Sequence, residues 1–234
     1  MNKFIKIINA IKSPQFFKSY INLVCPLFEM KKFLKNLKAV HSIIDVGSNK
    51  GQFLILADKF FPKAIKFSFE PQDKPLVLQK KILKKKKVKF YRFGLGEYAD
   101  KKTFYITNRE DSSSFLKPNS KICKDYEIVR EKTFNIKTLD SVMKNYNLKK
   151  KVLLKLDVQG YELAVLKGSL NTLKKVDYII LEISFKKIYK NQASKNNLIN
   201  FLKKNHFYIK DITNITKLKN DLFQADYLFE KKFI

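Results

Sequence analysis

Several residue types are scarce in this chain of 234 residues, and each shortage narrows its chemistry. The two cysteines, Cys25 and Cys123, are far apart and form no CxxC pair, so neither a disulfide framework nor a zinc site is indicated. No apolar run reaches the ~18 residues that a membrane-spanning helix needs. These shortages favour a cytoplasmic protein with free thiols and no metal site.

Arginine is also scarce, since only three of the 49 basic residues are arginines (Arg92, Arg109 and Arg130), although the formal charge is +28. Sites that read bases or clamp phosphates favour the planar fork of arginine. The lysine excess accompanies abundant Asn, Ile and Phe, which indicates a compositional bias. The charge therefore leaves an acidic substrate or peripheral contact with an anionic membrane open and disfavours a nucleic-acid partner.

The beginning of the chain differs from the rest. Residues 1–40 are predicted to form helical pieces that break at Pro14 and Pro26. A helix packed on the domain is favoured over one on a membrane surface. Residues 41–234 are predicted to form one domain, which is long enough to bury a full core. The apolar residues near the start of the chain recur at the intervals of one helix face; they are Phe4, Ile5, Ile8 and Ile11.

From Ser42 onward, short apolar runs alternate with amphipathic stretches. This alternation predicts an α/β fold with a doubly wound parallel sheet and helices on both faces. Ligands of such sheets bind beyond the carboxyl ends of the strands, where the strand order reverses. The predicted strands are 43–46, 65–70, 88–93, 102–107, 133–136, 152–157, 177–183, 207–212 and 223–229, and the helices are 51–60, 74–83, 161–166 and 193–204.

The loop DVGSNKG, which starts at Asp45, has only two glycines, Gly47 and Gly51. It lacks the G-x-G-x-x-G fingerprint of dinucleotide sites, which disfavours a nicotinamide oxidoreductase. Its leading acid would repel a phosphate but suits a cation. Glu70 ends the next strand, where an acid can accept hydrogen bonds from both ribose hydroxyls. S-adenosylmethionine is such a cationic nucleoside without phosphate, although an ordinary strand-turn-helix with an exposed acid remains the alternative.

Further segments follow this loop over residues 42–231, in the order IIDVGSNKGQF, FSFEPQ, YRFGLGE, TLDSV, LLKLDVQGYELAVLKGS with YIILEIS, and QADYLFEK. With these segments the chain resembles the FkbM-type methyltransferases, a family of class I S-adenosylmethionine-dependent enzymes. Asn49 stands where the general class I loop has a glycine, but the FkbM-type loop commonly has asparagine there. Gln159 stands where many members have glutamate, so no acidic role is predicted at that position.

The resemblance implies a Rossmann-like sheet of seven strands, mostly parallel, with the last strand antiparallel, to which the chain adds the N-terminal helices. It also implies S-adenosylmethionine as the cofactor, with Glu70 on its ribose. The other implied cofactor contacts are Asp45, Gly47, Asn49 and Gly51, with Gly94 and Leu95 near the adenine.

A hydroxyl acceptor calls for a general base. His41 and His206 are predicted at strand starts, on the edge opposite the ligand, so they are interpreted as structural or surface residues. Asp157 is the leading candidate for the base, because it ends a strand at the ligand edge. Lys155 points to the same face and is predicted to keep Asp157 ionised or to neutralise a developing oxyanion. Glu182 is a weaker candidate.

Each candidate also has a structural interpretation. Asp157 could instead accept hydrogen bonds from the amides around Gly160. A buried, self-neutralising pair of Lys155 and Glu182 is favoured over catalysis. The loop Asp111–Ser114 borders either the acceptor pocket or solvent.

The leading hypothesis is a methyltransferase that acts on a hydroxyl of a small molecule or glycan. The alternative is an RNA-modifying methyltransferase, which the basic charge supports. A non-enzymatic binding module would be credible only without Asp45 or Glu70, and both are present.

Overall fold

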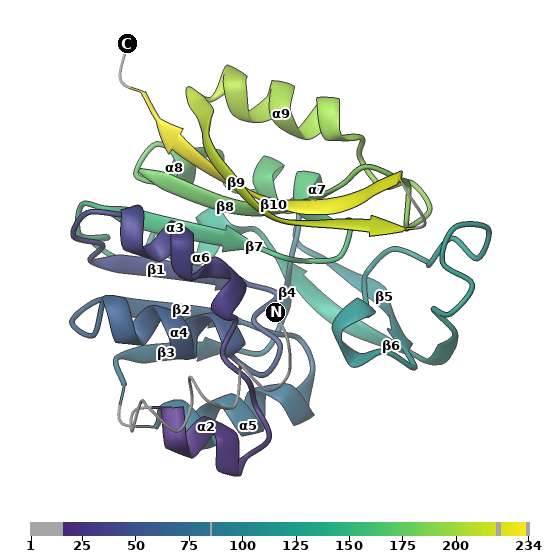
Figure 1. Ribbon diagram of the computed structural model, residues 1–234, viewed down its shortest axis with the longest axis horizontal. Coiled ribbons are helices and arrows are strands. Elements are labelled where there is room, and N and C mark those ends of the chain that lie inside the picture. Colours follow the sequence, from purple (N-terminus) through teal and green to yellow (C-terminus); the bar gives the residue numbers. More distant parts are fainter. Residues whose placement is uncertain (1–15, 85, 219–220, 233–234) are drawn as a thin grey trace.

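The main sheet of the computed structural model is mostly parallel (Figure 1). The structure describes residues 16–84, 86–218 and 221–232. Within them the sheet has seven strands in the spatial order β3-β2-β1-β7-β8-β10-β9. Their bounds are β1 (Ser42–Val46), β2 (Ile65–Phe69), β3 (Val88–Tyr91), β7 (Val152–Leu156), β8 (Tyr178–Ser184), β9 (Phe207–Leu218) and β10 (Asp221–Lys231).

Strand directions confirm the fold predicted from the sequence. β1 pairs in parallel with both β2 and β7, while β3 and β8 extend the parallel arrangement outward. β10 is antiparallel to both of its neighbours, β8 and β9. The chain leaves β1 toward β2 on one side and later returns to β7 on the other. The strand order thus reverses at β1, and a crevice is expected at its carboxyl end.

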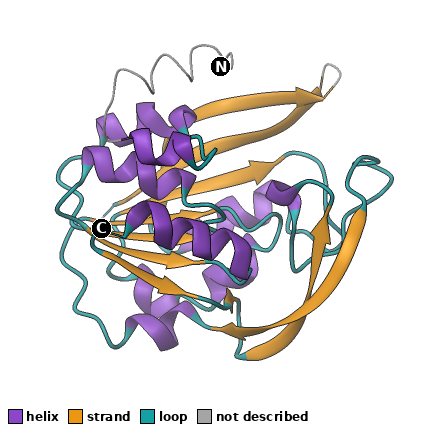
Figure 2. Ribbon diagram, turned by 90° about the horizontal axis from the view of Figure 1, so that it is seen from below, coloured by secondary structure: helices purple, strands orange, loops and turns teal. Residues whose placement is uncertain are grey.

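Helices cover both faces of this sheet (Figures 1 and 2). Alternate residues of β1 show the two sides, because Ile43 packs in one buried apolar cluster with Leu54, and Ile44 packs in the other with Leu202. The first face carries α3 (Lys31–Asn36), α4 (Gln52–Phe60) and α5 (Asp73–Leu83). The second carries α6 (Leu139–Met143), α7 (Glu162–Lys167), α8 (Leu170–Leu173) and α9 (Lys195–Lys204).

A second, smaller sheet lies to one side of the main sheet (Figure 1). Its three strands in the described chain are β4 (Gly94–Leu95), β5 (Asp100–Thr107) and β6 (Ile128–Lys137). The two extra strands predicted around a polar loop are therefore present, and both are longer than predicted. The short helix η3 (Glu110–Ser112) lies in that loop, where the chain turns back toward the carboxyl edge of the main sheet.

The described part of the N-terminal segment is helical, with α2 (Phe17–Ile21) and η2 (Phe28–Met30) before α3. Side chains such as Phe33 and Leu34 are buried in the same cluster as α4, although the domain division at residue 40 stays a prediction. The helix predicted around Phe4–Ile11 lies outside the described residues. No helix in the described ranges is long and apolar enough to cross a membrane.

Candidate cofactor and active site

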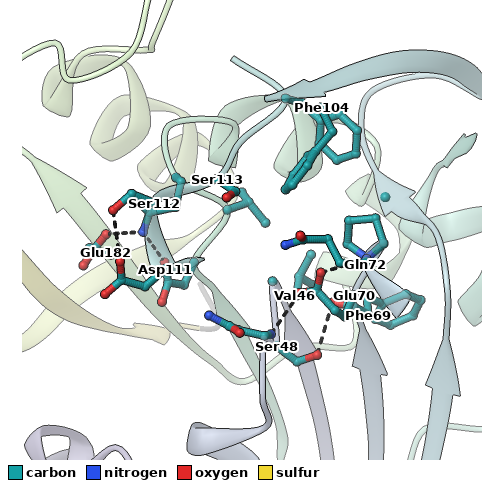
Figure 3. A pocket seen from close by; sticks show the side chains of 18 of the residues that line it. Val46, Ser48, Phe69, Glu70, Gln72, Phe104, Asp111, Ser112, Ser113 and Glu182 are labelled. Carbon is teal, nitrogen blue, oxygen red and sulfur yellow. Dashed lines mark hydrogen bonds between the residues drawn. The ribbon is translucent and has the colours of Figure 1, made fainter. Parts of the chain in front are cut away.

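A cavity of about 300 Å³ lies at the carboxyl ends of β1, β2 and β7, between the main sheet and the loop that follows β5 (Figure 3). This is the position that the reversal of strand order predicts. Most of the site residues predicted from the sequence line this cavity. They are Gly47, Asn49, Glu70, Gly94, Leu95, Lys155 and Asp157.

The loop after β1 is hydrogen-bonded to Glu70, which directly follows the neighbouring strand β2. The backbone amide of Asn49 donates to Glu70 Oε2 at 3.0 Å, and that of Gln72 donates to Oε1 at 2.9 Å. Asn49 takes the left-handed conformation, with φ of 44°, which an asparagine tolerates better than most residues. Its side-chain oxygen is buried and accepts no hydrogen bond from the described residues. A ligand with a donor at this point would satisfy it.

Glu70 is almost fully buried at the cavity wall. Burial raises the pKa of its carboxyl to about 7. The hydrogen bonds from the backbone amides of Gln72 and Asn49 oppose this shift, because they stabilise the ionised form. Each carboxylate oxygen can accept a second hydrogen bond besides the one from the backbone. Glu70 can therefore receive two hydroxyls of a ligand when it is ionised.

Asp45 and Gly51 are the two predicted contacts that do not line the cavity. Asp45 is fully buried, and its Oδ1 lies 3.5 Å from the ammonium of Lys155. Burial raises the pKa of Asp45 to about 6, while Lys155 lowers it. Gly51, with φ of 82°, precedes α4 at its N-cap. Asp45 thus contacts Lys155 below the cavity wall, and Gly51 shapes the start of the helix.

Lys155 links two carboxylates. Its Nζ lies 3.2 Å from Asp157 Oδ2 and 3.5 Å from Asp45 Oδ1. Burial lowers the pKa of Lys155, but Asp157 and Asp45 together raise it above its usual range. The prediction that Lys155 pairs with Glu182 is wrong, because the ion-pair partners of Lys155 are the two aspartates. Glu182 Oε2 instead accepts a hydrogen bond from Gln159 Nε2 at 3.1 Å. The lysine thereby holds the side chain of Asp157 in place on the cavity wall.

The alternative interpretation of Asp157 as a cap for nearby amides is wrong. The amides of Val158 and Gly160 donate to Glu162 Oε1, at 3.2 and 3.0 Å. Asp157 Oδ1 instead accepts from the side-chain amide of Gln159 at 2.8 Å. Sequence reasoning missed Glu162 in this role, although an acid two residues after Gly160 was a signal for it. Asp157 is left to face the cavity.

The loop before and within η3 forms the wall opposite the main sheet. Asp111, Ser112 and Ser113 line the cavity, so of the two interpretations for this loop the structure supports the pocket border. Arg109 and Tyr126 line the cavity too, although neither was predicted as a site residue. The guanidinium of Arg109 lies 5.3 Å from the centre of the Tyr126 ring. Figure 3 shows Asp111, Ser112 and Glu182 on one side of the cavity and Glu70 on the other.

The two histidines lie far from this chemistry, as predicted. His41 directly precedes β1 and His206 directly precedes β9, so both are at the opposite edge of the sheet from the cavity. His41 Nδ1 is 2.6 Å from the carbonyl oxygen of Lys150. Among the described residues, no group of three or more His, Cys, Asp or Glu side chains could hold a metal ion.

Comparison with known families decides the class of this site. A model of the methyltransferase FkbM domain matches residues 45–209, more than two thirds of the chain. The chain belongs to the FkbM methyltransferase family. Membership confirms that the protein is a methyltransferase, as the sequence predicted. A search of curated protein sequences gave no match.

Solved structures similar to this FkbM methyltransferase are distant. Magnesium protoporphyrin IX methyltransferase from Synechocystis PCC 6803, with bound SAM, is 12% identical over 99% of this chain and 86% of its own, with a TM-score of 0.48. Precorrin-6y C5,15-methyltransferase from Geobacter metallireducens is 11% identical over 86% and 87%, with a TM-score of 0.46. The tRNA methyltransferase TrmK from Bacillus subtilis is 11% identical over 87% and 65%, with a TM-score of 0.44. At these values the likenesses carry no conclusion about the acceptor.

Proposed function

We propose that this FkbM methyltransferase methylates a hydroxyl group of a small molecule or glycan, and that Asp157 is the general base. The observation that carries the proposal is the position of the Asp157 carboxylate. It lines the same cavity as Glu70 and is held from both sides, by Lys155 at 3.2 Å and by Gln159 at 2.8 Å.

The residues present fit the cofactor. Glu70 offers oxygens for the two ribose hydroxyls, and the unpaired Oδ1 of Asn49 offers an acceptor for the ammonium group. Phe93, Leu95 and Phe115 form an apolar wall of the kind that an adenine ring contacts. Bound there, S-adenosylmethionine supplies an activated methyl group on a sulfonium.

The chain's own part in the reaction is alignment and proton transfer. The cavity walls orient the acceptor hydroxyl, and orientation alone can contribute about 7–11 kcal/mol to lowering the barrier. Asp157 would take the hydroxyl proton while the acceptor oxygen gains the methyl carbon, whose bond to the sulfonium would break and leave a neutral thioether. Lys155 balances the charge on Asp157 before the transfer, while Asp45 beneath it balances the charge on Lys155.

Two features support a small or narrow acceptor over RNA. The cavity, at about 300 Å³, is at the lower end of the range for small-molecule sites. Of the three arginines, only Arg109 lines it, and its Nε lies 3.7 Å from Asp111 Oδ1. A stacked or bidentate clamp on nucleic acid would call for more than one free guanidinium.

Labelling with S-adenosylmethionine that carries a tritiated methyl group tests the acceptor class. Wild-type protein is incubated with a fractionated cell extract, and each labelled fraction is divided between ribonuclease, protease and glycosidase treatment. We expect the label in small molecules or in material that only the glycosidase releases. Label that ribonuclease releases would overturn the proposal in favour of RNA modification, and a boiled-enzyme sample controls for chemical methylation.

The affinity for S-adenosylmethionine is expected to fall at acidic pH. Because the pKa of Glu70 is raised to about 7, its carboxylate is lost as the pH falls through neutrality. If the ribose hydroxyls bind the carboxylate form, the Kd rises about tenfold between pH 8 and pH 6. Isothermal titration calorimetry measures this. Glu70→Gln is the control, since it should bind weakly at both values and lose the pH dependence. A wild-type Kd that stays constant over this range would contradict the role of Glu70.

A further inference from the structure

The turn after β7 holds Gln159 in an unusual conformation. Its φ is 54°, in the left-handed region, which costs a residue other than glycine about 1 kcal/mol or more. Gly160 follows with φ of 92°, and the turn is fixed by the two amides that donate to Glu162. Backbone strain of this kind persists only where surrounding contacts hold it. The side chain of Gln159 adds contacts of its own to those of Glu162.

The side-chain amide of Gln159 lies between two carboxyl groups of the cavity wall. Its Nε2 is 2.8 Å from Asp157 Oδ1 and 3.1 Å from Glu182 Oε2. Its Oε1 is 2.8 Å from the hydroxyl of Tyr189. The amide has two hydrogens, one for each carboxyl group. The opposite orientation would set an amide oxygen against two carboxyl oxygens, so the network determines how the amide lies.

Tyr189 connects this amide to the loop on the other side of the cavity. It is buried, and its hydroxyl also lies 2.8 Å from the carbonyl oxygen of Ser112. From the same loop, the hydroxyl of Ser114 donates to the backbone carbonyl of Gln159 at 2.7 Å. The turn is therefore held through both its side chain and its backbone. Movement of the loop that carries Ser112 would be transmitted to Asp157 and Glu182.

We propose that Gln159 is a positioning residue for methyl transfer, which sets the Asp157 and Glu182 carboxyl groups on the cavity wall and joins them to the loop that carries Ser112. This inference rests on the proposed function, because it assigns Asp157 as the base. A neutral donor suits this place, since it separates two acids without adding charge. A carboxyl side chain at the same position would set three acids together.

Glu182 reports on this arrangement because its carboxyl accepts a hydrogen bond from the side-chain amide of Gln159. Burial raises the pKa of Glu182 well above its ordinary value, and Asp157, Asp226 and Glu162 raise it further, while Gln224 lowers it. Lys155 faces the same cluster. Loss of the donor from Gln159 should destabilise the ionised form of Glu182.

Carbon-13 spectroscopy of the glutamate carboxyl groups tests the proposal without an identified acceptor. The full chain is labelled at glutamate Cδ, and Glu182→Gln assigns the Glu182 signal. In Gln159→Leu we expect the titration of Glu182 to move to higher pH by about one unit. Tyr189→Phe, which removes only the hydroxyl that orients the amide, should give a smaller shift in the same direction.

Gln192→Leu is the matched control. Gln192 is buried beside Tyr189, and its Oε1 accepts from the backbone amide of that residue at 3.1 Å, but it does not line the cavity. This variant should lose stability and leave the Glu182 titration in place. An unmoved titration in both folded Gln159→Leu and Tyr189→Phe would overturn the inference. If Gln159→Leu does not fold, Tyr189→Phe decides alone.

Calorimetry with S-adenosylmethionine keeps the two proposals apart. In Gln159→Leu the Kd should stay within about twofold of wild type, because the side chain of Gln159 hydrogen-bonds Asp157, Glu182 and Tyr189, which are not among the residues proposed to hold the cofactor. The rate of tritium transfer to the wild-type acceptor fraction should fall about tenfold or more. Failure of the wild-type protein to bind the cofactor would refute the proposed function. The Glu182 titration would still show whether Gln159 sets the carboxyl groups on the cavity wall.

Discussion

Replacing Asp157 with asparagine is expected to slow methyl transfer by about 10²–10⁴-fold, the usual contribution of a general base. The change removes the proton acceptor but keeps the shape of the side chain and an oxygen for the amide of Gln159. Lys155 keeps Asp45 as a partner, so its buried ammonium is not left unpaired. The rate is measured as tritium transferred per minute to the acceptor fraction that the wild-type protein labels.

Affinity for the cofactor separates this role from a structural one. The Kd of S-adenosylmethionine for Asp157→Asn should stay within about threefold of wild type, because the contacts proposed for its ribose and adenine are unchanged. Asp221→Asn is the matched control, since Asp221 lies in β10, is largely exposed and pairs with Lys186. Small and similar losses of rate and affinity in Asp157→Asn would show that Asp157 only supports the turn.

Much of the fold could be predicted because its strands are marked by local pattern. The run VLLKLD and the segment IIDVG are apolar stretches with an acid at or near their carboxyl end, and the structure has the buried strands β7 and β1 there. The short helices α6 and α8 were not predicted. With five and four residues, they are too short to show helical periodicity, and their position depends on packing against the rest of the second face.

Only the part of the candidate site that lies at the ends of strands could be predicted from the sequence. A position at the carboxyl end of a strand brings Asp45, Glu70 and Asp157 together, but it does not say which of them reaches the cavity. Asp45 is fully buried because Lys155, at the paired position on β7, covers it. The contacts of Gln159 depend on a left-handed turn and on Tyr189, thirty residues away, which no local pattern encodes.

Of the two glycines in the loop after β1, Gly47 matters more for the shape of the loop. Gly47 has φ of 74°, and a Cβ atom there would lie 1.9 Å from the carbonyl oxygen of Asp157. That neighbour is backbone, so it cannot turn away as a flexible side chain would. An alanine at this position must therefore push the loop and the end of β7 apart, which moves Asp157 itself.

Gly47→Ala is expected to lower the free energy of unfolding by about 3 kcal/mol or more, because it combines an unfavourable φ with a backbone clash. Binding of S-adenosylmethionine should fall at least about tenfold, since the amide of Asn49 then loses its alignment with Glu70. Urea denaturation and calorimetry measure the two effects.

Gly51→Ala provides the matched comparison for this prediction. Gly51 also has a positive φ, of 82°, but its nearest neighbour would be the side chain of Gln79 at 3.1 Å. Gln79 is buried and hydrogen-bonded to Ser48 and Ser68, but its side chain needs to shift by only a few tenths of an ångström. The cost should therefore be about 1–2 kcal/mol, mainly from the backbone conformation. Equal losses of stability in the two variants would mean that φ, and not the contact with Asp157, explains the glycine at position 47. A clearly larger loss for Gly47→Ala would tie the cofactor loop to the strand that carries the proposed base.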